Sequence, residues 1–386
     1  MLRMLNRTRV VNQTSITHFI LVGLIGHRRT QIALFVAILT AYLMTMLGNV
    51  MVILLMQLDS LLHTPVTLEG TGTVNHTTIT EVILLGLTSH RRTQIALFVV
   101  ILFAYGITML SNLLIIMLVR SDSRLHTPMY LFLSNLSGLE MCYISSIVPQ
   151  MLTHMLSGSG RISFNCCMAQ MYITCSLACT EGLLLGAMAY DRYLAICCPL
   201  VYPTAMSRER CVMLAIASWA GAFLLSGIIT ACILHLPFCG PNHINHFLCE
   251  FIMVIKLACT NTHFAELSVF VLGIFTVFIP FCVILTSYGV ILLSVTRMSS
   301  SVTRNKAFST CTSHLTVVII FYGSIIGIYM RPQPGTDHGN DKLGSFFNVV
   351  FTPLLNPVIY TLRNKDVHAA MTKVLHGRAA GHKTGL

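Results

Sequence analysis

The sequence predicts an all-α membrane protein: a bundle of seven transmembrane helices, preceded by one extra, duplicated helix. Three observations carry this prediction. Hydrophobic residues make up 55% of the 386 residues and charged residues only 10%, whereas charged residues are about 25% of a soluble domain. Apolar segments of the roughly 20 residues needed to cross a bilayer recur along the chain. Basic residues lie mainly on one side of those segments, as the positive-inside rule requires.

The candidate spans follow one another with short connections. No connection is long enough to fold as a soluble domain, so an enzyme with a soluble core is excluded. We expect helices over residues 31–56, 94–119, 129–152, 166–195, 211–234, 267–295, 310–330 and 343–362.

The net charge of +11 reflects membrane topology rather than nucleic-acid binding. If Arg192 faces the cytosol, thirteen of the Lys and Arg residues after residue 75 fall on the cytosolic side and six on the other. This distribution follows the positive-inside rule and places the carboxyl end in the cytosol. No basic patch interleaved with aromatic residues is present, so nucleic acid is not an expected partner.

The amino-terminal part of the chain is duplicated. Residues 12–65 recur as 75–128, with 34 of 54 aligned positions identical. Each copy holds a glycosylation sequon, an HRR triplet, an apolar segment and LHTP, and only the second copy continues into the next span. We therefore divide the chain into a duplicated tail with an extra helix and linker (1–74), a core (75–375) and a short cytoplasmic tail (376–386). Asn75 is the expected glycosylation site.

The extra segment 31–56 has several possible fates. A span with a cytosolic start agrees with its flanking charges and would put the sequons at Asn6 and Asn12 out of reach of glycosylation. There are three alternatives: the segment lies on the membrane surface, it is cleaved off, or it is an artefact of a joined gene model. The charges concerned are Arg3, Arg7, Arg9, Arg28 and Arg29 before the segment, and Asp59 and Glu69 after it.

An acid–base pair ends the third core segment, in the sequence MAYDRYLAICCPL. Ionisable groups in a membrane helix are costly and usually functional. An arginine held by the neighbouring Asp191 can be released when helices move, which is the behaviour of a switch rather than of a catalytic site. The alternative is that Arg192 only anchors the helix end at the membrane surface.

Four sequence blocks together resemble the olfactory (odorant) receptors, a branch of the rhodopsin-like G-protein-coupled receptors. They are LHTPMYLFLSNLS (125–137), MAYDRYLAICCPLVY (188–202), KAFSTCTSH (306–314) and PLLNPVIYTLRN (353–364). The resemblance covers residues 75–373. It implies a plasma-membrane receptor, not an enzyme, that binds a small volatile odorant and activates a stimulatory olfactory G protein to raise cyclic AMP. A transporter, the competing class, would show inverted repeats, whereas the repeat here is adjacent and holds one helix.

The resemblance also assigns roles to residues. A switch that meets the G protein is implied at one end of the bundle, with a proline-kinked hinge in the last helix. A simple structural kink is the alternative for the hinge. The implied switch residues are Asp191, Arg192, Tyr193, Lys306, His314, Asn356, Pro357 and Tyr360.

Four cysteines on the non-cytosolic side permit two disulfides, and their spacing does not fix the pairing. A zinc site of Cys239, His243, His246 and Cys249 is the competing interpretation. The resemblance implies bridges Cys167–Cys249 and Cys239–Cys259, and Cys166 could compete for Cys249.

Glu140 and Glu181 are carboxylates inside predicted spans, where an unpaired charge is costly. The resemblance implies a sodium ion here, although the family usually has Asp at the position of Glu140. A proton shared between the two carboxyls is the alternative. We expect no other cofactor and no other metal.

A ligand cavity is expected among the third, fifth and sixth core helices, as binding sites in bundles lie between helices. Its lining would be apolar with a few hydroxyls and no fixed charge, which suits a small, weakly polar molecule better than an amine. Ordinary helix packing is the alternative for each residue. The candidates are Met171, Thr174, Cys175, Ala178, Cys179, Thr276, Tyr322, Ile325 and Tyr329.

Overall fold

The computed structural model describes residues 79–238, 242–297, 301–329 and 338–363, together with residues 367, 369, 370 and 372. The duplicated tail, its apolar segment 31–56, the sequons at Asn6, Asn12 and Asn75, and the tail 376–386 lie outside these described residues. The side chains of Lys306 and Tyr329 are also outside the description.

Seven helices in the described part are long and apolar enough to cross a membrane, which confirms the seven predicted core spans. The helices extend past the apolar segments because polar first turns such as Arg208–Glu209–Arg210 are also helical. The spans are α2 (Arg91–Ser121), α3 (Pro128–Ser157), α4 (Phe164–Cys197), α6 (Arg208–Leu234), α8 to α9 (His263–Thr296), α10 (Ser301–Tyr329) and α11 to α12 (His338–Arg363).

Local sequence sets several helix ends. The Ser163 hydroxyl accepts a hydrogen bond from the Cys166 amide at 3.2 Å and caps α4, and Ser207 caps α6 in the same way. Such caps satisfy one of the amide groups that the first turn leaves without a partner. Gly158 ends α3 with a φ of 69°, a left-handed conformation that glycine adopts without strain.

Two spans contain a wide π-helical turn just before a proline. In the fifth span, η2 (Ile274–Phe278) joins α8 (His263–Gly273) to α9 (Ile279–Thr296), where Pro280 is the second residue. In the last span, η3 (Phe347–Phe351) joins α11 (His338–Phe346) to α12 (Thr352–Arg363). In each turn an amide donates to the carbonyl five residues earlier, from Ile279 to Ile274 and from Thr352 to Phe347. Because proline has no amide hydrogen, it cannot make the usual helical bond to the carbonyl four residues earlier, and a wide turn precedes it in both spans.

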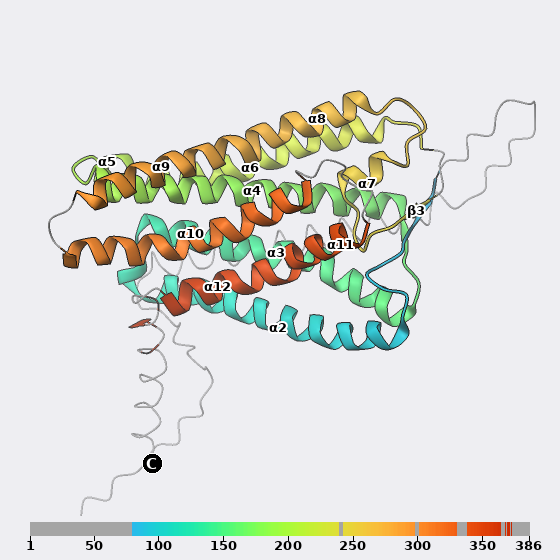
Figure 1. Cartoon of the computed structure of the whole chain (residues 1–386), viewed down its shortest axis with the longest axis horizontal. Coiled ribbons are helices and arrows are strands. Elements are labelled where there is room, and N and C mark those ends of the chain that lie inside the picture. Colours follow the sequence, from blue (N-terminus) through green and yellow to red (C-terminus); the bar gives the residue numbers. More distant parts are fainter. Residues whose placement is uncertain are drawn as a thin grey trace, which may run out of the picture. The chain divides into compact units, whose positions relative to one another are not determined.

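The third span, α4, lies at the centre of the bundle. It contacts α3, α6, α9 and α10, and Figure 1 shows it running among them. Two thirds of its membrane segment (67%) is buried, against 28% for α2 and 22% for the span from α8 to α9. A movement at one end of α4 therefore reaches most of the other helices directly.

A small sheet, which the sequence did not predict, lies at one end of the bundle. Strand β1 (Glu81–Leu84) pairs antiparallel with β2 (Arg161–Ser163) and parallel with β3 (His243–Ile244). The sheet ties the segment before α2 to the loops before α4 and after α6. Figure 1 shows β3 and the short helix α7 (Phe251–Ile255) at the opposite end from α5 (Tyr202–Ala205). We call these the Cys167 end and the Asp191 end of the bundle.

Candidate functional site

At the Asp191 end, a buried carboxylate holds the arginine beside it. The Asp191 side chain is fully buried, and its Oδ2 lies 3.3 Å from Nη2 of Arg192, whose side chain is 15% exposed. The Tyr202 hydroxyl, on α5, donates to the other oxygen at 3.0 Å. The sequence pointed to the pair but not to Tyr202, although all three lie in one block.

Tyr202 is suited to hold the Asp191 carboxylate because its hydroxyl keeps its proton. Burial and the neighbouring Asp191 carboxylate raise the pKa of the Tyr202 hydroxyl well above its usual value. A protonated hydroxyl donates to an ionised carboxylate, and hydrogen bonds to charged groups are the stronger kind. Asp191 is therefore held by one charged and one neutral partner.

His314 has a different partner from the one expected. The resemblance implies that it belongs to the switch together with Asp191 and Arg192. The structure buries it completely, and its Nδ1 lies 2.6 Å from the hydroxyl of Tyr288 on α9. The reason is depth: α10 begins at Ser301, so His314 lies roughly 20 Å along the helix at 1.5 Å per residue.

Tyr193 and the end of α4 pack against α9. Tyr193 lies in a cluster with Tyr288, Ile291 and Val295. Cys197, one turn further on, donates from its thiol to the Ser294 hydroxyl at 3.3 Å. The Asp191 end of α4 is thus attached to α9, which in turn holds α10 through Tyr288.

Several buried polar atoms at the Asp191 end have no hydrogen-bond partner among the described residues. They are Nε of Arg192, Nε2 of His314 and the hydroxyl of Tyr360. Buried polar groups are nearly always paired, and each unpaired one costs about 1–3 kcal/mol. A rearrangement that paired these groups would gain stability, so this end of the bundle is suited to adopt a second conformation.

Deeper in the bundle, the two predicted carboxylates lie with two asparagines from other helices. Asn356, on α12, donates to Oε1 of Glu140 on α3. Asn112, on α2, donates to the Pro353 carbonyl at 3.5 Å. Four buried oxygens have no hydrogen-bond partner in the described part of the chain: Glu140 Oε2, Glu181 Oε1, Asn112 Oδ1 and Asn356 Oδ1.

At the Cys167 end, a disulfide joins Cys167 to Cys249 across 82 residues of sequence. Cys249 therefore cannot supply a thiolate to the zinc site considered above, and Cys166 is a free thiol. Cys259 is also disulfide-bonded, whereas Cys239, its expected partner, lies outside the described residues.

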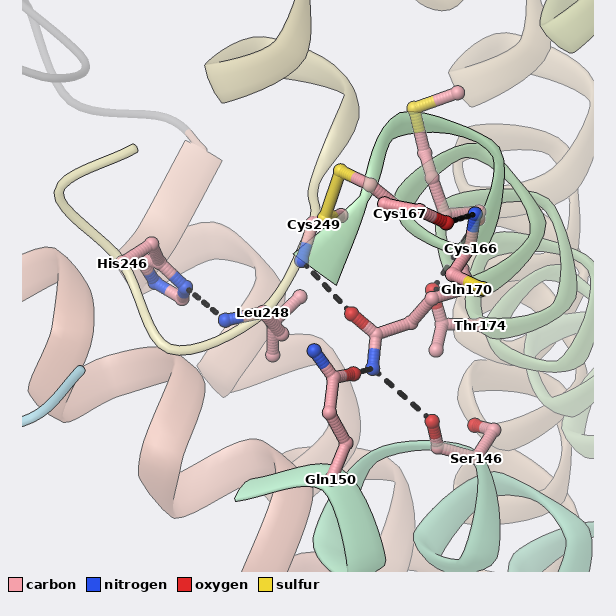
Figure 2. Close-up of a disulfide and its surroundings, with 11 residues drawn as sticks. Ser146, Gln150, Cys166, Cys167, Gln170, Thr174, His246, Leu248 and Cys249 are labelled. Atoms are coloured by element: carbon pink, nitrogen blue, oxygen red, sulfur yellow. Dashed lines mark hydrogen bonds between the residues drawn. A yellow bond between two sulfur atoms is a disulfide. The ribbon is translucent and has the colours of Figure 1, made fainter. Parts of the chain in front are cut away.

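Gln170 fixes the loop beside this disulfide. Its Oε1 accepts from the Cys249 amide at 3.1 Å, and its Nε2 donates to the Ser146 carbonyl at 3.1 Å and to Gln150 at 2.5 Å. Figure 2 shows Gln170 between the loop and α3. Gln170 was not predicted as a site residue, although it follows Cys167 by one helical turn and so lies on the same face.

Three of the predicted ligand residues meet around Gly182 of α4. The Cys179 thiol donates to the Thr276 hydroxyl at 3.4 Å. A Cβ at Gly182 would lie 2.8 Å from the Thr276 carbonyl and 3.6 Å from the Tyr322 hydroxyl. Only glycine allows this close approach of the Thr276 carbonyl to α4.

The other predicted ligand residues divide into two groups. Met171, Thr174 and Cys175 lie on α4 nearer the disulfide, with Ala178 half-buried between them and Cys179, and Ile325 lies on α10 one turn beyond Tyr322. The structure also adds a carboxylate that was not expected near this region. Glu250, which follows Cys249, accepts from the buried Ser345 hydroxyl at 3.1 Å.

This chain is similar to known olfactory receptors. The olfactory receptor profile matches residues 101–378. Olfactory receptor 2D2 of Homo sapiens is 48% identical over 301 residues, which cover 78% of this chain and 97% of the relative. Olfactory receptor-like protein OLF3 of Canis lupus familiaris is 44% identical over 315 residues (82% and 98%). Olfactory receptor 5B21 of Mus musculus is 45% identical over 306 residues (79% and 96%).

Proposed function

This chain belongs to the olfactory receptor family, and we propose that it binds a small volatile odorant inside its helix bundle and activates a stimulatory olfactory G protein, which raises cyclic AMP. It is a multi-pass membrane protein of the G-protein-coupled receptor class and not an enzyme. The proposed location is the plasma membrane, with the Asp191 end and the carboxyl terminus in the cytosol.

The observation that carries this proposal is the restrained arginine at the Asp191 end. Asp191 is fully buried and pairs with Arg192, while Nε of the same guanidinium has no partner among the described residues. An arginine that lost this carboxylate would present a cation with several donors to a partner protein. The geometry supports a resting state that holds the partner-binding group in place until the helices move.

The odorant region and the switch share two helices. Cys179 and Asp191 both lie on α4, and Tyr322 and His314 both lie on α10. Eight residues separate Tyr322 from His314, roughly 12 Å along a helix. An odorant that displaces α10 at Tyr322 would therefore strain the bond between His314 and Tyr288. A preference of about 1.4 kcal/mol for the displaced arrangement shifts the equilibrium tenfold.

An exposed apolar residue lies beside the switch. Leu200, between α4 and α5, is 94% exposed, and Val201 next to it is 53% exposed. Both directly precede Tyr202, the partner of Asp191. Apolar side chains that protrude in this way suit insertion into a pocket on a partner protein. We assign Leu200 to the G-protein contact.

We also propose a sodium ion among the four unpaired oxygens near Glu140. Carboxylate and amide oxygens are the ligands that hard cations prefer, and these oxygens come from α2, α3, α4 and α12. Glu140, Glu181, Asn112 and Asn356 would hold the ion, which would neutralise the carboxylates. Sodium chloride should then raise the melting temperature of the purified receptor more than choline chloride does, and Glu140→Gln should remove the difference. An equal effect of both salts would favour the shared proton instead.

The experiment that tests the receptor proposal compares Arg192→Ala with the native chain. Cells that express the stimulatory olfactory G protein are exposed to a panel of volatile molecules, and cyclic AMP and surface receptor are measured together. We expect the odorant-evoked signal to fall at least tenfold while surface expression is retained. Undiminished signalling by a normally expressed Arg192→Ala variant would contradict the assigned role.

A further inference from the structure

Two free thiols meet on one face of α4. Cys175 and Cys179 lie four residues apart, and their Sγ atoms are 3.9 Å from each other. Neither cysteine is in a disulfide; Cys179 is buried and Cys175 is half-buried. No metal other than sodium was expected from the sequence, because four-residue spacing places side chains on one helix face without showing that they touch.

The helix keeps these two thiols from forming a disulfide. A disulfide needs Cβ atoms about 3.5–4.5 Å apart, whereas side chains four residues apart on a helix have Cβ atoms about 5–6 Å apart. Because α4 is helical throughout Phe164–Cys197, a bond between Cys175 and Cys179 would require the helix to unwind. The pair therefore stays available as two thiols, although the Cys167–Cys249 disulfide begins only about two turns earlier on the same helix.

The distance between the two sulfurs suits a shared metal ion. Thiolate sulfur binds a metal at about 2.3 Å, so two sulfurs on one ion lie about 3.8 Å apart at a tetrahedral angle and about 4.6 Å apart in a line. The observed distance of 3.9 Å falls within this range. An ion between Cys175 and Cys179 would therefore require little movement of α4.

The kind of ion follows from the number and type of the ligands. Among the residues that the structure describes, no group of three or more His, Cys, Asp or Glu side chains could hold a metal. A structural zinc ion takes four such ligands, so a pair of thiols does not suit zinc. Thiolate and thioether sulfurs select Cu(I). Met171, one turn before Cys175, adds a buried thioether to the cluster in which both cysteines pack.

Hydroxyl groups on two neighbouring elements support the sulfurs. The Ser226 hydroxyl, on α6, donates to Cys175 Sγ at 3.7 Å. The Cys179 thiol donates to the Thr276 hydroxyl of η2 at 3.4 Å. That hydroxyl donates to the Leu272 carbonyl, and it can turn toward the sulfur once Cys179 loses its proton. Hydrogen bonds from such groups orient the ligands of a metal and stabilise them, so each sulfur has a supporting hydroxyl at hand.

We propose that Cys175 and Cys179 form a binding site for one Cu(I) ion. The ion bonds to both sulfurs, the two thiol protons go to solvent, and the resulting dithiolate complex carries one negative charge. Ser226 and Thr276 donate hydrogen bonds to the two sulfurs and so stabilise this charge. Because binding releases protons, the affinity for Cu(I) should increase as the pH rises. The site goes beyond the proposed function and needs neither an odorant nor a G protein.

The first test measures how many Cu(I) ions the purified full-length receptor takes from a coloured Cu(I) chelator. We expect the native chain to take one ion that both Cys175→Ser and Cys179→Ser lose. The affinity should fall more than about 100-fold, because loss of a group that only supports a ligand already costs about 10–100-fold. Two matched controls should keep the ion: Cys142→Ser, an exposed thiol of α3, and Cys197→Ser, because Cys197 and its neighbour Cys198 do not face each other on a helix. No uptake by the native chain, or equal uptake by the native chain and both pair variants, overturns the proposal.

The second test uses the native chain and so does not depend on how the variants fold. X-ray absorption at the copper edge is recorded on the receptor loaded with one Cu(I) ion. We expect two or three sulfur neighbours at about 2.3 Å, whereas a copper ion surrounded only by nitrogen or oxygen atoms overturns the proposal. For the variants of the first test, an intact Cys167–Cys249 bridge, measured by mass spectrometry, serves as the folding control. Neither readout involves odorant or G protein, so this site and the proposed function can fail separately.

Discussion

The two ends of the bundle differ in how their buried polar groups are paired. At the Cys167 end, Gln170 uses both its oxygen and its amide to join the loop to α3, next to a disulfide, and Gln150 Nε2 is one buried atom there without a partner among the described residues. At the Asp191 end, Arg192 Nε, His314 Nε2 and the Tyr360 hydroxyl are buried without partners in the described residues. Satisfied polar networks favour one structure, whereas unpaired groups favour rearrangement. The difference indicates a fixed Cys167 end, which the proposed function places outside the cell, and a switching Asp191 end, which it places inside.

Loss of the disulfide should have the largest effect. Cys249→Ser opens a bridge across 82 residues, and removal of such a bridge costs about 3 kcal/mol or more. We expect surface receptor, measured by antibody labelling, to fall at least tenfold. Cys142→Ser removes an exposed free thiol of α3 and should leave surface expression unchanged. Normal surface levels of the Cys249→Ser variant would show that the outer end is not fixed by this bridge.

Gln170→Leu tests the same end without touching the bridge. The variant leaves the buried Cys249 amide without its acceptor, which costs about 1–3 kcal/mol. We expect a lower melting temperature and no change in basal cyclic AMP. Gln150→Leu, which keeps the bond from Gln170 to Cys249, should have a smaller effect. A rise in basal cyclic AMP in Gln170→Leu would contradict the difference between the two ends, because it would show that the Cys167 end also controls basal signalling.

Asp191→Asn tests the inner end. The amide cannot neutralise Arg192, so the resting arrangement is weakened, and a change of about 1.4 kcal/mol corresponds to a tenfold rise in basal cyclic AMP. The matched control is Glu209→Gln, because Glu209 is an exposed carboxylate at the start of α6 and exposed charges contribute little. An unchanged basal level in Asp191→Asn, with surface expression retained, would argue against the restraint.

Tyr288→Phe should give the smallest change. It removes the hydroxyl bonded to His314, and a single neutral hydrogen bond contributes about 1 kcal/mol. We expect basal cyclic AMP to rise a few-fold, whereas Tyr190→Phe, at an exposed position of α4, should have no effect. A fall in basal signalling instead would mean that the Tyr288–His314 bond belongs to the active arrangement.

The spans and the charged switch could be predicted because each depends on neighbouring residues. Hydropathy over about 20 residues identifies a span without knowledge of its partners, and Asp191 and Arg192 are adjacent. The predicted positions of the helix ends were less accurate, because polar turns such as the start of α6 at Arg208 continue a helix beyond its apolar part.

Features formed by distant residues could not be predicted. Strand β1 pairs with residues about 80 and 160 positions later, and its own sequence only suggests an apolar patch. His314 was placed near a helix end because its burial depends on where α10 begins. The close approach of the Thr276 carbonyl to Gly182 requires the π-helical turn before Pro280, which has no simple sequence pattern.

The most direct test measures the distance between the inner ends of α5 and α10 when an odorant binds. Probes are introduced as non-natural amino acids at the exposed positions Thr204 and Arg304, which leaves all native cysteines in place. The account predicts that the distance increases with odorant, and that it is already increased in Asp191→Asn without odorant. A rise in cyclic AMP at unchanged distance would contradict it.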